Sequence, residues 1–193
     1  MFQSTGLTAR FAPLANAFDA ERALAINPDN PDAHSVLAAD KIMDKNMAGA
    51  LLFINRGLAK DPNNLGLLMF KLKVFEDTRD DAGLEAVLRQ IIAANPTLVE
   101  IRQALLSFLA SRNRLADVER ELRAMIAAEP DNISRALDLV RLMGSTKGAT
   151  AARKELESLI AGKPDVVDYK LALAQIDFAD KQPDAATTAI GAI

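Results

Sequence analysis

Prolines recur in this chain at a fixed distance. Pro28, Pro62, Pro96, Pro130 and Pro164 follow one another at intervals of 34 residues, as 62 − 28 and each later difference show. The segments around them are similar: AINPDNP, AKDPNNL, AANPTLV, AAEPDNI and AGKPDVV. A fixed period of this length indicates supersecondary units that stack on one another, each burying its apolar face against its neighbours.

Each interval between prolines has the pattern of two helices. Within 65–75 and again within 84–92, apolar residues recur at helical spacing, and the polar segment TRDD separates the two stripes. Proline lacks an N–H and restricts the residue before it, so it should end the second helix. Polar residues just after each proline should cap the next helix: Asp29, Asn63, Asn64, Thr97, Asp131 and Asp165. The turns inside the units are predicted at Lys45–Asn46, Arg79–Asp80, Arg112–Asn113, Ser145–Lys147 and Lys181–Gln182.

Composition excludes several classes of function. The 193 residues include no cysteine and one histidine, so disulfides, thiolate zinc sites and most catalytic triads are excluded. Lys plus Arg number 23 against 26 Asp plus Glu, and a net charge of −3 does not suit nucleic-acid binding. No apolar stretch is long enough to span a bilayer. We expect no metal, no cofactor and no enzymatic activity.

The repeat pattern resembles that of the tetratricopeptide repeat (TPR) family, with divergent repeats. The resemblance implies an all-α fold, an α-α superhelix (solenoid) of stacked 34-residue helix-turn-helix repeats. In such a solenoid the first helices line a concave groove and the second helices cover the outside. The predicted organisation is a partial repeat at 8–30 (a second helix, about Phe11–Ile26), full repeats at 31–64, 65–98, 99–132 and 133–166, and a partial repeat at 167–193.

The departures from the family pattern are informative. The family's Trp position carries His34, Leu68, Arg102, Ala136 and Lys170, and we expect His34 to be a half-buried packing residue. Some family members clamp a C-terminal carboxylate with a Lys/Asn/Arg set in the groove. Ser35 and Ala39 stand where Lys and Asn would, which argues against a chaperone adaptor of that kind.

The groove residues follow from the repeat phase. Repeat positions 2, 5, 9, 12 and 13 should face the groove, which includes Ser35 in the first repeat and Leu171 and Phe178 in the fifth. The strongest candidates for peptide binding are Met69, Lys73, Gln103, Ser107, Leu137, Arg141 and Gln175. With Lys73 and Arg141 as isolated cations, this surface suits a peptide that has apolar anchors and one or two carboxylates.

Three local motifs are better explained by structure than by chemistry. The segment GSTKGAT at 144–150 looks like a phosphate loop, but its spacing is wrong and it falls in phase with a helix–helix turn. Asp29, Asn30 and Asp32 lack the glycine and distal glutamate of a calcium loop, so capping explains them better. The basic cluster of Arg112, Arg114, Arg120 and Arg123 is interpreted as a solvated face.

Two further hypotheses stand beside a peptide-binding scaffold. The chain stops within a helical pattern, so it is expected to be cut from a longer protein, as a structural or assembly arm of an enzyme or envelope export component. The last helix would expose Ala186, Ile190 and Ile193, and such an end favours homodimerisation. The compartment stays open: cytoplasmic by default, periplasmic for a fragment of an exported protein.

Overall fold

Helices account for all the regular structure in residues 16–179, the part of the chain that the computed structural model describes. The described residues contain no strand, so the all-α prediction is confirmed. The chain divides into two compact units, one ending at Phe108 and the other beginning at Leu109. The boundary falls inside helix α6 (Val99–Ser111), and each unit is described by itself below.

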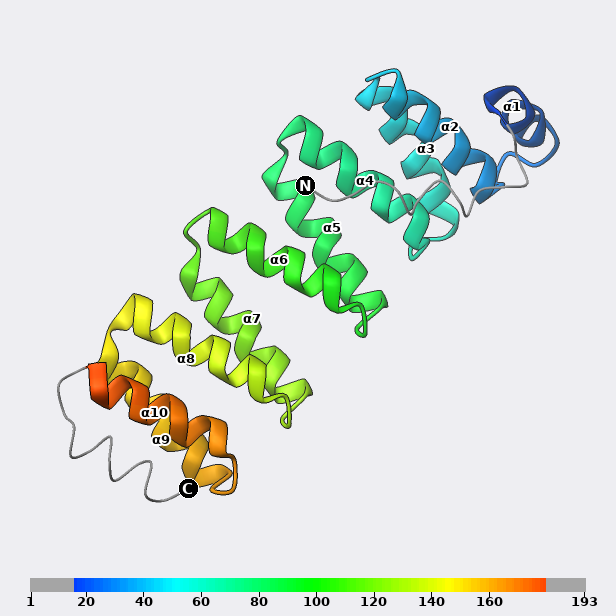
Figure 1. Ribbon diagram of the computed structural model, residues 1–193. Coiled ribbons are helices and arrows are strands. Elements are labelled where there is room, and N and C mark those ends of the chain that lie inside the picture. The colour runs from blue at the N-terminus through cyan, green and yellow to red at the C-terminus, as the bar shows by residue number, and fades with distance from the viewer. Residues whose placement is uncertain (1–15, 180–193) are drawn as a thin grey trace. The chain divides into compact units, whose positions relative to one another are not determined.

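Unit 1 is a stack of helical hairpins in which successive helices from α1 to α5 pack against each other (Figure 1). In addition, α2 contacts α4, so the first helices of successive repeats lie against each other. The elements are α1 (Ala17–Ile26), α2 (Pro31–Met43), α3 (Met47–Lys60), α4 (Leu65–Thr78), α5 (Asp81–Ala94) and the first part of α6.

Unit 2 repeats this arrangement. Successive helices from α7 to α10 pack together, and α8 also contacts α10, the next first helix (Figure 1). The elements are the last residues of α6, α7 (Leu115–Ala128), α8 (Ile133–Lys147), α9 (Ala149–Gly162) and α10 (Val167–Ala179). The predicted turn at Lys181–Gln182 and the apolar end at Ala186, Ile190 and Ile193 lie outside the described residues.

The prolines end the second helices as predicted. The helices α1, α3, α5, α7 and α9 each end two residues before the next proline, at Ile26, Lys60, Ala94, Ala128 and Gly162. The residue between the end of the helix and the proline has an extended backbone, with φ from −128° to −144°. Its N–H still donates to a carbonyl of the last helical turn. This is the conformation that a following proline ring imposes, because the ring excludes helical geometry from the residue before it.

The caps of the first helices lie one residue later than most of the predicted ones. Asn30, Asn64 and Asn132, each two residues after a proline, accept from backbone N–H groups of α2, α4 and α8. Only Asn64 was predicted correctly among Asp29, Asn63, Asn64, Thr97, Asp131 and Asp165. Asp29 and Asp131 instead form ion pairs with Lys60 and Lys163, and Thr97 and Asp165 bond no described residue through their side chains. Asparagine suits this position because its short amide reaches the free N–H groups of the first turn.

The turns inside the repeats share one backbone motif. Lys45, Arg79 and Asn113, again 34 residues apart, adopt positive φ between 55° and 58°. The next residue donates its N–H to the carbonyl five positions back, as Asn46 does to Lys41 at 2.8 Å and Asp80 to Phe75 at 2.9 Å. The turn predicted at Ser145–Lys147 is wrong, because α8 continues through Lys147 and Gly148 alone, with φ of 88°, makes the turn.

Replacing either non-glycine turn residue by glycine should stabilise unit 1. A side chain with a Cβ pays a steric cost at positive φ that glycine avoids. We expect Lys45→Gly and Arg79→Gly each to raise the free energy of unfolding by about 0.5–1 kcal/mol in chemical denaturation. Lys45→Ala is the matched control, since it removes the same side chain but keeps the Cβ. Equal effects of the glycine and alanine variants would contradict the conformational explanation.

The core follows the period even where the residue type changes. Ile54 and Leu88 in unit 1, and Leu122 and Leu156 in unit 2, occupy the same position of the second helices, and all are buried. In unit 2, Leu156 packs with Ala136, Val140, Ala152 and Tyr169. The repeated burial explains how divergent repeats keep one architecture: apolar volume is required at each position, while the particular side chain can vary.

Candidate functional site

All seven candidate groove residues lie on first helices. Lys73 on α4, Gln103 and Ser107 on α6, and Arg141 and Gln175 on α8 and α10 are exposed, whereas Met69 on α4 and Leu137 on α8 are half-buried. Ser35, which occupies a predicted groove position, is buried and donates its hydroxyl to the carbonyl of Pro31 at 2.9 Å. A buried hydroxyl that is bonded within its own helix is not available to a ligand. The prediction that Ser35 faces the groove is therefore wrong.

The two candidate cations are not isolated. Lys73 forms an ion pair with Asp77 one turn along α4, and Arg141 pairs with Asp138 on α8 at 2.7 Å. Sequence reasoning missed these partners, although spacings of i+4 and i−3 place them on one helix face. Exposed pairs of this kind contribute roughly 0–1 kcal/mol, so a carboxylate of a ligand can replace Asp138 or Asp77 at little cost.

Unit 2 carries exposed apolar side chains beside its candidate polar residues. On α10, Leu171 is 42% exposed and Phe178 is 75% exposed, and Gln175 lies between them on the same helix face. Leu137 and Arg141 lie on α8, which contacts α10. The candidate residues of unit 2 therefore lie on two neighbouring helices. Leu171 and Phe178 occupy predicted groove positions, and their large apolar side chains are the signal that marks them as candidates.

His34 is buried rather than half-buried. The residue is only 2% exposed, and Gly57 on α3 permits this, since a Cβ there would lie 3.2 Å from the His34 Cβ and 2.5 Å from a Leu67 methyl. The His34 Nε2 lies 2.9 Å from the carbonyl oxygen of Pro28, to which it donates. At the same repeat position Arg102 donates to the carbonyl of Pro96 at 3.2 Å. In these two repeats, the side chain at the family's Trp position therefore donates a hydrogen bond to the carbonyl of the preceding proline.

Three of the four arginines of the basic cluster pair with carboxylates of unit 2. Arg114 and Arg120 both contact Asp117 at 2.6 Å, and Arg123 pairs with Glu119 and with Glu155 on α9. Lys147, the lysine of the discounted phosphate-loop motif, also contacts Glu119, at 2.7 Å. Hydrogen bonds, chiefly from Lys147 and then Arg123, hold the pKa of Glu119 below its ordinary value of 4.5, and Arg114 lowers the pKa of Asp117 likewise.

These ion pairs predict an acid-labile contribution to the stability of unit 2. Carboxyls with a lowered native pKa stabilise the fold above their ordinary pKa, and this stabilisation is lost as the pH falls through the native pKa. The loss therefore begins near pH 4.5 for Glu119 and grows below it. We expect Glu119→Gln to be less stable than wild type at pH 7 and the difference to shrink at acid pH. Urea unfolding across the pH range measures it, and a difference independent of pH would contradict the assignment.

Other chemical sites are not formed by the described residues. Residues 16–179 contain no group of three His, Cys, Asp or Glu side chains placed to hold a metal ion. Among the helices described, none is both long and apolar enough to cross a membrane.

The chain is similar to known proteins at the level of structure. No family model and no curated protein matches the chain. A crystal structure of YrrB, described as a TPR protein with an unusual peptide-binding site, is 10% identical and covers 91% of each chain at a TM-score of 0.51. The structure of Naa15/Naa10 bound to HypK-THB reaches a TM-score of 0.63 at 13% identity, over 91% of this chain and 28% of the other. The MamA protein is 17% identical over 84% of this chain and 88% of its own, with a TM-score of 0.48.

Proposed function

We propose that this chain, which has the tetratricopeptide-repeat fold, is a non-catalytic scaffold that binds a peptide segment of a partner protein along its first helices. The observation that carries the proposal is the exposed pair Leu171 and Phe178 on α10, beside Gln175 and next to the helix that carries Arg141. Large apolar side chains left exposed around polar groups are typical of interaction surfaces. The likeness to YrrB, described as having a peptide-binding site, adds to this support.

The chemistry of the unit 2 surface defines the peptide. Apolar side chains of the ligand would pack against Leu171 and Phe178, and the amide of Gln175 offers both a donor and an acceptor to the peptide backbone. Arg141, whose side chain is 74% exposed, would exchange Asp138 for a carboxylate of the ligand. The ligand is therefore an extended segment with two apolar residues and an acidic residue.

Unit 1 offers a second, more polar stretch of the same kind. Met69 and Lys73 lie on α4, and Gln103 and Ser107 lie on α6. On unit 1 by itself, Lys73 would bind an acidic residue of a ligand in place of Asp77, since their contact is an exposed pair on one helix.

Charge reversal tests the proposal. We expect the double variant Lys73→Glu/Arg141→Glu to lose a partner that the wild-type chain captures from lysate, as quantified by mass spectrometry. Both side chains are exposed, so the free energy of unfolding should change by about 1 kcal/mol or less.

The matched control reverses two exposed cations that are not on first helices. Arg79 lies in the α4–α5 turn and Lys154 lies on α9, so Arg79→Glu/Lys154→Glu makes the same change in net charge elsewhere. This control should retain the partner. If both double variants captured the partner equally, peptide binding through Lys73 and Arg141 would be refuted. If neither the wild-type chain nor the variants captured a partner, a structural arm would be favoured.

A further inference from the structure

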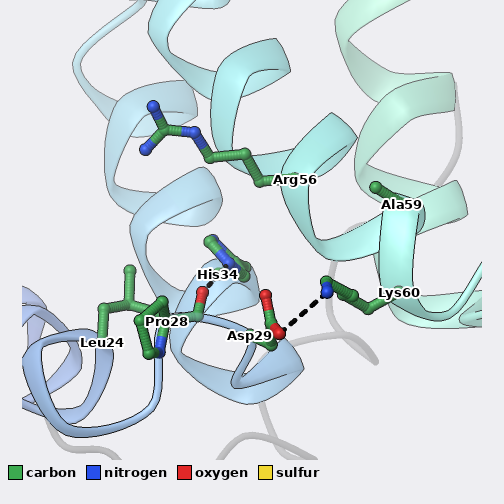
Figure 2. Close-up of a pocket in the computed structure, with 7 residues that line it drawn as sticks. All are labelled: Leu24, Pro28, Asp29, His34, Arg56, Ala59 and Lys60. Atoms are coloured by element: carbon green, nitrogen blue, oxygen red, sulfur yellow. Dashed lines mark hydrogen bonds and ion pairs between the residues drawn. The ribbon is translucent and has the colours of Figure 1, made fainter.

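A pocket lies on unit 1 away from the residues proposed above. It has a volume of about 460 Å³ and lies between α1, the α1–α2 turn, α2 and α3 (Figure 2). Its lining residues are Leu24, Pro28, Asp29, His34, Arg56, Ala59 and Lys60. The volume is within the range of pockets that hold small ligands or single peptide residues.

The charges around the pocket favour a single negative charge. Lys60 is held by Asp29 at 2.9 Å, as the dashed line in Figure 2 marks, so these two charges offset each other. His34 donates from Nε2 to the carbonyl of Pro28, and its buried Nδ1 has no hydrogen-bond partner among the described residues. Arg56 makes no ion pair with any residue in 16–179 and supplies the remaining positive charge.

The remaining walls favour an aliphatic group with a neighbouring amide. Leu24, Pro28 and Ala59 supply apolar surface. Asp29 contacts Lys60 through Oδ2, which leaves Oδ1 able to accept a hydrogen bond from an incoming N–H. The terminal residue of a peptide combines all three features: a carboxylate, an aliphatic side chain and an amide N–H.

We propose that this pocket binds the C-terminal carboxylate of a peptide that ends in an aliphatic residue. The carboxylate pairs with the guanidinium of Arg56, the side chain packs on Leu24, Pro28 and Ala59, and the last amide N–H donates to Asp29. A free aliphatic acid would satisfy the first two interactions but not the third. The site is independent of the first-helix surface, so either proposal can fail without the other.

NMR titration of the full ¹⁵N-labelled chain tests the assignment with three defined probes. They are acetyl-Gly-Ala-Leu as the free acid, the same peptide as its C-terminal amide, and 4-methylpentanoate. We expect the peptide acid to shift the amide signals of 24–34 and 56–60 with a Kd below about 1 mM. The amide and 4-methylpentanoate should each bind at least tenfold more weakly.

Three variants place the site. Arg56→Gln should weaken binding of the peptide acid at least tenfold, whereas Arg79→Gln, the same change at an exposed position in the α4–α5 turn, should leave it unchanged. Ala59→Trp should abolish binding with Arg56 still present, because it fills the pocket. Equal binding of acid and amide, full binding by Arg56→Gln, or no binding of the peptide acid would overturn the proposal. Tighter binding of 4-methylpentanoate than of the peptide acid would overturn the assignment to a peptide terminus.

Discussion

Arg153→Met is expected to destabilise unit 2 by about 3 kcal/mol, the cost of leaving a buried charge without its partner. Asp177 on α10 is only 2% exposed, and its Oδ1 forms an ion pair with Nη2 of Arg153 on α9. Among residues 16–179 no other partner is found for this oxygen, so the ion pair with Arg153 is the contact that holds it. The methionine of the variant keeps most of the aliphatic length of the arginine but removes that attraction.

The two partners should not be equivalent. The Arg153 side chain is 25% exposed and can reach water when Asp177 is absent, whereas Asp177 cannot reach water when Arg153 is absent. Asp177→Leu should therefore cost less than Arg153→Met. The double variant Arg153→Met/Asp177→Leu should recover most of the stability lost in Arg153→Met, because apolar pairs can replace buried ion pairs at little cost.

Native-state hydrogen exchange is the suitable measurement, because it reports the opening free energy of each unit separately. The opening free energy of the most protected amides of α9 and α10 should fall by about 3 kcal/mol in Arg153→Met. A loss below about 1 kcal/mol, or a larger loss in Asp177→Leu than in Arg153→Met, would show that the pair does not behave as a buried ion pair.

Leu156→Ala should have a similarly large effect, for a different reason. Leu156 is fully buried among Ala136, Val140, Ala152 and Tyr169, three of which are small or β-branched and cannot fill the space left behind. Truncation of a buried leucine costs about 2–5 kcal/mol, of which part is the lost transfer free energy and part is the cavity. We expect about 3 kcal/mol, measured by the same hydrogen exchange in unit 2.

The neighbouring position provides the control for this substitution. Glu157 lies next to Leu156 on α9 and is exposed, so Glu157→Ala should change the opening free energy by about 0.5 kcal/mol or less. If both alanine variants had similar small effects, Leu156 would not be the core position that the repeat period predicts.

The sequence was sufficient to predict the architecture because helix ends are encoded locally. A proline restricts the residue before it whatever the tertiary context, so the end of every second helix could be placed from five residues. The fold class followed from the 34-residue period, and the structure confirms it. The prediction of a turn at Ser145–Lys147 failed because α8 continues through Lys147, where the hydroxyls of Ser145 and Thr146 donate to the carbonyl of Leu142, and Gly148 makes the turn.

Features that depend on contacts between elements could not be read from the residues. The burial of His34 requires the small Gly57 on another helix, and the burial of Asp177 requires Arg153 24 positions earlier in the chain. Asp29 and Asp131 have the chemistry of caps, but lysines at the ends of α3 and after α9 compete for them. The pocket around Arg56 combines three helices, and no spacing in the sequence marks it.

The candidate groove residues remain predictions derived from repeat phase. These residues lie on the first helices of the repeats, but repeat phase alone did not reveal that Lys73 and Arg141 have acidic neighbours on the same helix face. That arrangement bears on affinity, because the ligand must displace an intramolecular carboxylate before it binds.

Site-specific photocross-linking tests the central claim, that a partner binds along the first helices. A photoreactive phenylalanine analogue placed at Ser107 on α6 or Gln175 on α10 is compared with the same residue at Ala86 on α5 or Glu157 on α9, all four positions being exposed. We expect cross-links to one protein from Ser107 and Gln175 and none from Ala86 and Glu157. Cross-links from the second helices alone, or from none of the four positions, would contradict it.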